Sequence, residues 1–147
     1  LTAERYISAI AQELGHVGAL TLEMFETRHG LVANETAPRV HNSGHWTIEG
    51  AHCSQFENHV RAVAGLPLGS TTCALPTAMV NIIGEHPAKA DVLAEHDAHL
   101  HFYGKSEREG RKLGHITLRA ANHHELQARL QKMALLLPNP MSLPIER

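Results

Sequence analysis

Two glutamates near the start of the chain, Glu23 and Glu35, are spaced so that both could bind one divalent cation. Residues 20–25 alternate with the period of a β-strand, and residues 31–35 predict a second strand. Residues 27–30, Thr-Arg-His-Gly, form a plausible turn between them, with the glycine able to adopt a positive φ. The pattern therefore predicts a hairpin with one carboxylate on each strand.

The register of this turn leaves two cross-strand partners open for Glu23, namely Asn34 and Glu35. Directly opposed Cβ atoms lie about 5 Å apart, and two like charges at that distance repel each other. A shared Mg²⁺ ion would turn the repulsion into binding, because Mg²⁺ takes one or two carboxylates and leaves positions for waters and phosphate oxygens. The spacing alone favours the alternative of two solvated glutamates on a surface hairpin, because acidic residues are common on hairpins.

The segment from Asn34 to His45 concentrates a carboxylate, two amides, a guanidinium, a hydroxyl and two imidazoles directly after the second strand. Arg39 can hold a phosphate or a carboxylate with two parallel hydrogen bonds. The spacing of His41 and His45 would suit a metal only on a helix, whereas the composition indicates a loop. Neither an HExxH motif nor a Cys/His finger is present. A zinc or nickel module is therefore a weaker alternative, and an ordinary polar loop also stays open.

Helices and strands that could position these residues follow from periodicity and from capping residues. The segment from Thr36 to Cys53 has no clean period and predicts a long loop. Ser54 and Asn122 each precede a glutamate by three residues, as capping boxes do. The predicted helices cover residues 2–15, 54–64 and 122–137, the predicted strands cover residues 78–83, 98–103 and 113–118, and residues 86–96 form a connector with some helical character.

The composition excludes several classes of function. The net charge is −2 and there is no lysine or arginine run, so we expect no nucleic-acid partner. Cys53 and Cys73 are isolated and predict free thiols in a reducing, cytoplasmic compartment. No apolar stretch approaches the roughly 20 residues that span a bilayer, and no signal peptide is visible. Leu1 is not a start residue, so we expect that the chain is truncated in front.

The run NETAPRVHNSGHWTIEGAHCSQFENHVRAVAGLPLGS, from Asn34 to Ser70, resembles the signature region of the N5-carboxyaminoimidazole ribonucleotide synthetases, which are ATP-grasp ligases. The resemblance continues through ELGHVG at residues 13–18 and LTLE at residues 20–23. Towards the other end, HLHFYGK at residues 99–105 and GRKLGH at residues 110–115 are similar to the family's C-terminal substrate loop. Nearly the whole chain is covered, as a C-terminal fragment of such a protein.

The resemblance implies an α+β fold. Residues 1–70 would form part of the C-terminal lobe of an ATP-grasp domain, an antiparallel sheet with helices, and residues 71–147 a small β-rich C-terminal subdomain. It also implies ATP-dependent carboxylation of 5-aminoimidazole ribonucleotide by bicarbonate through carboxyphosphate, in purine biosynthesis. The implied ligands are Mg²⁺, ATP, bicarbonate and the ribonucleotide, with no nucleic acid or membrane, and the full-length protein would be a homodimer.

Individual roles follow from the resemblance at matching positions. Glu23 and Glu35 resemble the magnesium ligands, with Asn34 assisting and contributing with Glu35 to the ATP site. Arg39 resembles the catalytic cation that holds bicarbonate, carboxyphosphate or the substrate. The substrate-binding residues implied are His41, Asn42, Ser43, His45, Lys105, Arg111 and Lys112. Without the resemblance, the three basic residues of the last group are most simply solvated charge.

The family's N-terminal domain, its ATP-gripping lysines and its glycine-rich flap have no counterpart among these residues. We therefore expect the chain to be inactive alone, because its residues could not close a site around ATP and exclude water. Two alternatives stay open: another ATP-grasp ligase, and a non-catalytic ATP-grasp-like binding module. The complete set of Glu23, Asn34, Glu35 and Arg39 argues against the second, since a scaffold gains nothing from opposed carboxylates.

Overall fold

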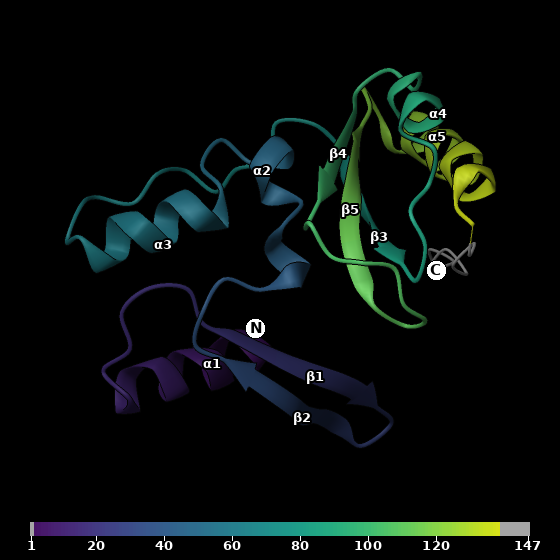
Figure 1. Cartoon of the computed structure of the whole chain (residues 1–147). Coiled ribbons are helices and arrows are strands. Elements are labelled where there is room, and N and C mark those ends of the chain that lie inside the picture. The colour runs from purple at the N-terminus through teal and green to yellow at the C-terminus, as the bar shows by residue number, and fades with distance from the viewer. Residues whose placement is uncertain (1, 139–147) are drawn as a thin grey trace. The chain divides into compact units, whose positions relative to one another are not determined.

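The computed structural model describes residues 2–138, and the chain divides between Thr72 and Cys73 into two compact units (Figure 1). The elements of the first unit are α1 (Thr2–Glu13), β1 (Thr21–Thr27), β2 (Gly30–Ala37), the 3₁₀ helix η1 (Asn42–Gly44), α2 (Thr47–Gly50) and α3 (Gln55–Val63). The elements of the second unit are β3 (Thr77–Ile83), α4 (Lys89–Leu93), β4 (Ala98–Phe102), β5 (Lys112–Arg119) and α5 (His123–Leu136). This architecture confirms the predicted α+β class.

The hairpin β1–β2 is the central feature of the first unit, and its turn is the predicted one. Gly30 has a φ of +116°, and the Thr27 hydroxyl donates to the Gly30 carbonyl oxygen over 2.8 Å. The strands are antiparallel, with Glu23 opposite Glu35 and Met24 opposite Ala33. A β-bulge therefore leaves the residue between Ala33 and Glu35 without a direct partner. Of the two predicted registers, the one that opposes the carboxylates is confirmed.

The prediction of an unbroken loop from residue 36 to residue 53 is wrong, because this segment contains η1 and α2. Both are held by hydrogen bonds between side chains and backbone, which periodicity does not reveal. His41 has extended backbone angles and accepts the Ser43 N–H with its ring, which caps η1. The Thr47 hydroxyl donates to the Gly44 carbonyl over 2.6 Å and joins η1 to α2.

The helix α3 begins at the predicted place, where the Ser54 hydroxyl accepts the Glu57 N–H over 3.2 Å. The Glu57 carboxylate accepts hydrogen bonds from the Arg61 guanidinium, one turn later in the helix. Val60 and Val63 recur at helical spacing along α3, but their side chains are 64% and 63% exposed. These two valines therefore do not form a buried face of α3 in the described structure.

The second unit is a three-stranded antiparallel sheet in the order β3-β5-β4, with α4 and α5 on one face (Figure 1). Its core lies between sheet and helices, and Ile82, Ile116 and Met133 are among its fully buried side chains. The Asn122 side chain caps α5 by accepting the Glu125 N–H over 2.9 Å, as the sequence predicts. Within the described residues no helix has both the length and the apolar character to cross a membrane. Both cysteines are free, as expected.

Candidate functional site

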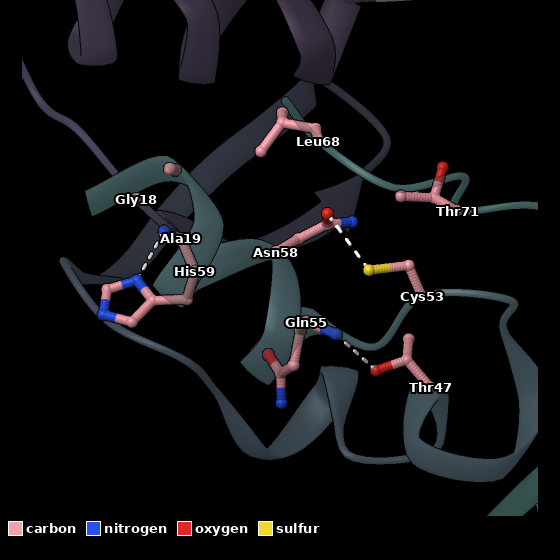
Figure 2. Close-up of a pocket in the computed structure, with 10 residues that line it drawn as sticks. Gly18, Ala19, Thr47, Cys53, Gln55, Asn58, His59, Leu68 and Thr71 are labelled. Carbon is pink, nitrogen blue, oxygen red and sulfur yellow. Dashed lines mark hydrogen bonds between the residues drawn. The ribbon is translucent and has the colours of Figure 1, made fainter. Parts of the chain in front are cut away.

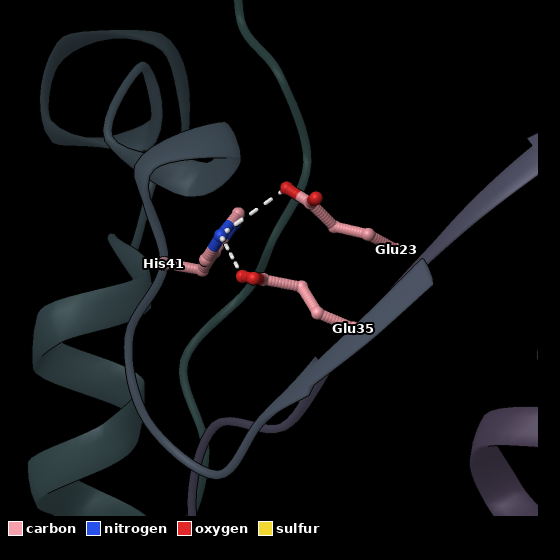
Figure 3. A group of neighbouring side chains, drawn as sticks. All are labelled: Glu23, Glu35 and His41. Carbon is pink, nitrogen blue, oxygen red and sulfur yellow. Dashed lines mark ion pairs between the residues drawn. The ribbon is translucent and has the colours of Figure 1, made fainter. Parts of the chain in front are cut away.

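The carboxylates of Glu23 and Glu35 extend from the hairpin towards the ring of His41, which precedes η1 (Figure 3). His41 Nε2 lies 3.3 Å from Glu23 Oε1 and 3.6 Å from Glu35 Oε1. One potential ligand atom of each residue lies within 4.8 Å of the others. The half-buried Glu23, the exposed Glu35 and the buried His41 are thus close enough to share a single cation.

The hydrogen bonds of His41 define which ring nitrogen carries the proton. The Ser43 N–H, which can only donate, points at Nδ1 over 3.3 Å, and the Ser43 hydroxyl lies 2.9 Å from the same atom. Nδ1 is therefore an acceptor, and the ring proton belongs on Nε2, which faces Glu23 and Glu35. In this geometry His41 donates to the carboxylates, and ligating a metal would require Nδ1 to give up the Ser43 N–H.

Asn34 occupies the bulge next to Glu35 and reaches across the hairpin. Its Nδ2 donates to Glu23 Oε2 over 3.2 Å. Since the amide nitrogen faces Glu23, the amide oxygen is the atom of Asn34 that could ligate a cation. The three oxygen donors predicted for the metal therefore arise from adjacent cross-strand positions, and the bulge brings the third to the pair.

Arg39 lies on the exposed stretch between β2 and η1, where Nη1 donates to the Val40 carbonyl over 3.0 Å. Its guanidinium offers five donors, so this single bond leaves capacity for an anion. Of the predicted substrate-binding residues nearby, Asn42 and Ser43 form part of η1 and His45 lies at its C-terminal end. His41 contacts both carboxylates of the hairpin.

Gln55, which the sequence analysis did not single out, holds this loop together. Its Oε1 accepts the His41 N–H over 3.0 Å, and its Nε2 donates to the His41 carbonyl over 2.8 Å and contacts His45 Nδ1 at 2.7 Å. Its backbone N–H donates to the Thr47 hydroxyl over 2.9 Å. In the sequence, only the place of Gln55 at the start of α3, shortly after the loop, points to this role. A contact between residues 14 positions apart leaves no local sequence pattern.

The hydrogen bonds of Gln55 to His41 and His45 form a clamp, and a cavity of about 210 Å³ in the first unit is lined in part by Gln55 (Figure 2). Its walls include Gly18, Cys53, His59 and Leu68, and Gln55 closes one side. The Ala19 N–H donates to His59 Nδ1 over 3.0 Å at its edge. None of the predicted metal or substrate residues lines this cavity, so it is separate from the carboxylate pair.

In the second unit, the basic residues Lys105 and Arg111 lie on the loop between β4 and β5, and Lys112 begins β5. Arg111 Nη1 donates to the Ser106 carbonyl over 3.2 Å and to the Ser106 hydroxyl over 3.0 Å. The Gly84 N–H donates to the Arg111 carbonyl over 2.8 Å. The loop is thus tethered at its base, while Lys105 at its start is exposed.

Tyr103 connects this loop with the sheet. Its hydroxyl lies 2.7 Å from Nδ1 of the buried His115, whose ring stacks on His101 at a centroid distance of 4.4 Å. Burial raises the pKa of the Tyr103 phenol. The ammonium of Lys105 lies 5.4 Å from the centre of the Tyr103 ring, a cation–π distance that orients the lysine.

Family models match both units of the chain. The model described as the ATP-grasp domain matches residues 1–56. The model described as the phosphoribosylaminoimidazole carboxylase C-terminal domain matches residues 77–129. The two segments together contain Glu23, Asn34, Glu35 and the basic loop.

Curated relatives match over almost the same extent. The chain is 58% identical over 135 residues to the N5-carboxyaminoimidazole ribonucleotide synthase of Pseudomonas aeruginosa. This match covers 92% of this chain and 38% of that protein. It is 48% identical over 136 residues to the Escherichia coli synthase, with the same two coverages. The chain thus spans less than two fifths of the length of these relatives.

Solved structures agree with the sequence matches. The synthetase from Thermus thermophilus superposes with a TM-score of 0.88 at 54% identity, over 99% of this chain and 39% of that one. The Aspergillus clavatus synthase, crystallised with ADP and 5-aminoimidazole ribonucleotide, gives 0.72 at 37% identity, over 81% of this chain and 34% of that one. These neighbours confirm the predicted ATP-grasp relationship of the fold.

Proposed function

Because the chain belongs to the N5-carboxyaminoimidazole ribonucleotide synthetase family, we propose that it takes part in the ATP-dependent carboxylation of 5-aminoimidazole ribonucleotide by bicarbonate. The products are N5-carboxyaminoimidazole ribonucleotide, ADP and phosphate. The observation that carries the proposal is the opposed carboxylate pair with Asn34 in the adjacent bulge. The ADP and ribonucleotide held by the Aspergillus clavatus relative support the same substrates.

The first unit contributes the metal ligands in this proposal. Glu23, Glu35 and Asn34 can ligate a metal only through oxygen atoms, and a hard ion such as Mg²⁺ prefers oxygen ligands. Bound Mg²⁺ would offset negative charge on the phosphoryl group transferred from ATP. His41 keeps its Nε2 proton directed at both carboxylates and so limits their mutual repulsion.

Arg39 supplies a fixed cation for the anionic reactants. Bicarbonate is a poor electrophile, and taking the γ-phosphoryl group of ATP onto one of its oxygens gives carboxyphosphate and ADP. The exocyclic amine then attacks the carboxyl carbon, or the carbon dioxide that carboxyphosphate releases, with loss of phosphate and of one amine proton. A guanidinium that holds two oxygens at once keeps the carboxylate in line for this attack. His41, Asn42, Ser43 and His45 complete the substrate side of the loop.

The second unit contributes the contact with the ribonucleotide phosphate. Lys105, Arg111 and Lys112 place three cations around one tethered loop, an arrangement that suits a dianion. We accordingly assign residues 1–70 to the ATP-grasp domain and residues 71–147 to a C-terminal subdomain for the substrate phosphate. The complete protein is expected to act as a homodimer.

A chimera tests the proposal. This chain replaces the matching segment of the Pseudomonas aeruginosa synthase, with which it shares 58% identity. ADP release is measured with Mg-ATP and bicarbonate, with and without aminoimidazole ribonucleotide. We expect release that requires the ribonucleotide and falls at least 100-fold in Glu35→Ala, since this change removes a metal ligand. Glu26→Ala, another acidic residue of β1, is the matched control and should keep the activity.

Release that does not need the ribonucleotide would favour another ATP-grasp ligase, and a fully active Glu35→Ala chimera would refute the metal assignment. The 147-residue chain alone should release no ADP under the same conditions.

A further inference from the structure

The orientation of the Gln55 amide is determined by the backbone around it. The oxygen of an amide only accepts hydrogen bonds and its nitrogen only donates them. The His41 N–H can only donate and therefore requires Oε1 opposite it, and the His41 carbonyl can only accept and requires Nε2. The two bonds fix the amide in one orientation.

This orientation also determines the tautomer of His45. The second proton on Nε2 of Gln55 points at His45 Nδ1, 2.7 Å away. A nitrogen that accepts a hydrogen bond carries no proton, so the ring proton of neutral His45 belongs on Nε2. One amide therefore fixes the backbone at His41 and the ring of His45 at the same time.

The absence of a side chain at Gly44 leaves the space that the Gln55 amide occupies. A Cβ atom built on Gly44 would lie 2.5 Å from Gln55 Oε1, much closer than non-bonded atoms approach. Glycine at this position thus lets η1 approach the amide, and the Thr47 hydroxyl receives the Gln55 N–H from the other side (Figure 2).

We propose that Gln55 is a positioning residue that sets the distance between His41 and the Glu23–Glu35 pair and presents His45 with its proton on Nε2. The effect of Gln55 on catalysis rests on the proposed function, because it concerns the reactants of the synthase reaction. Its structural part concerns only contacts within the first unit. Loss of the clamp lets the loop move, so carboxyphosphate, or the carbon dioxide that it releases, leaves the site before the amine attacks.

The structural part is tested in the 147-residue chain by NMR of the histidine ring nitrogens. Gln55→Glu keeps an oxygen for the His41 N–H but replaces the donor at His45 Nδ1 with an acceptor. We expect neutral His45 to change from the Nε2–H to the Nδ1–H tautomer. Glu57→Gln, the reverse change two residues later on an exposed position of α3, should leave His45 unchanged.

The catalytic part is tested in the chimera by the ratio of ADP released to carboxylated product formed, which does not depend on how much enzyme is folded. In Gln55→Glu we expect kcat for product formation to fall on the order of 10–100-fold. The ratio of ADP released to product formed should rise. Gln55→Met, which removes every side-chain hydrogen bond at similar length, should behave likewise. If either variant fails to fold, the other carries the test.

An unchanged His45 tautomer in Gln55→Glu overturns the structural part, and an unchanged ADP-to-product ratio in both variants overturns the catalytic part. A chimera that is inactive with the unaltered chain refutes the proposed function instead, and the NMR comparison then still decides the role of Gln55.

Discussion

Replacing Glu35 by Gln should have two effects of opposite sign, because the same carboxylate pair repels itself and attracts cations. Without a cation, the change removes the repulsion between Glu23 and Glu35, whose oxygens lie within 4.8 Å. The side chains are 39% and 55% exposed, so both carboxylates reach water and a water-like dielectric applies. Coulomb's law then gives about 0.9 kcal/mol, and physiological salt reduces this to about 0.5 kcal/mol. His41 keeps its closer partner, Glu23.

With a cation the order should reverse. Losing one carboxylate ligand should weaken binding of Mn²⁺, a spectroscopically visible substitute for Mg²⁺, by about tenfold or more. At a Mn²⁺ concentration of about 100 times the wild-type Kd, binding stabilises the wild type by about 2.7 kcal/mol and a tenfold weaker variant by about 1.4 kcal/mol. Binding thus favours the wild type over Glu35→Gln by about 1.3 kcal/mol, and subtracting the repulsion of about 0.5 kcal/mol leaves the wild type more stable by about 0.8 kcal/mol.

Urea unfolding of the 147-residue chain in EDTA and in Mn²⁺ measures both effects, and Glu26→Gln on the same strand is the control. The reasoning would be refuted if Glu35→Gln were the less stable protein in EDTA, or if Mn²⁺ stabilised both proteins equally. The first result would mean that Glu35 has a structural partner that outweighs the repulsion, and the second that the cation does not lie at the hairpin.

Three further changes test the second unit. Gly114→Ala should lower the free energy of unfolding by about 1–3 kcal/mol in urea titrations, since its Cβ would overlap the His101 backbone oxygen on the neighbouring strand. Burial acts to raise the pKa of Asp97, but hydrogen bonds and charges of two basic neighbours lower it overall. The ionised Asp97 therefore stabilises the fold above the ordinary pKa, and this stabilisation is lost as pH falls through the lowered pKa. Asn tolerates the φ of 57° at this position, so Asp97→Asn should reduce stability at neutral pH and flatten the loss of stability in acid. Burial raises the pKa of Tyr103, so its contribution is present below the ordinary pKa and lost as pH rises through the raised value. Tyr103→Phe should flatten the alkaline part of the stability profile.

The sequence predicted the hairpin well because its signals are local. An alternation of period two and a turn with glycine at its end specify which residues oppose one another, and Glu23 and Glu35 followed from counting. The same counting left two registers open, since a bulge adds one residue without changing the composition of either strand. Asn34 was therefore found as a candidate, but its place in the bulge was not.

The loop after the hairpin was predicted poorly because its order comes from distant contacts. Nothing periodic marks η1, which depends on the ring of His41 and the hydroxyl of Thr47. Gln55 reaches His41 from 14 residues away, and only the folded chain brings the two together. The sheet of the second unit was easier, because β-strand patterning and the Asn122 cap are written in neighbouring residues.

The two halves of the carboxylate site thus differ in what keeps them in place. Glu23 and Glu35 are fixed by the ladder of β1 and β2, which many backbone hydrogen bonds share, so no single side chain determines their positions. His41 depends on a few side-chain bonds, of which Gln55 makes two to its backbone. A change at α3 therefore reaches the carboxylates through His41, whereas a change at an exposed hairpin position does not. Catalysis should accordingly be more sensitive to Gln55 than to Glu26, although Glu26 lies on the same strand as Glu23, a proposed metal ligand.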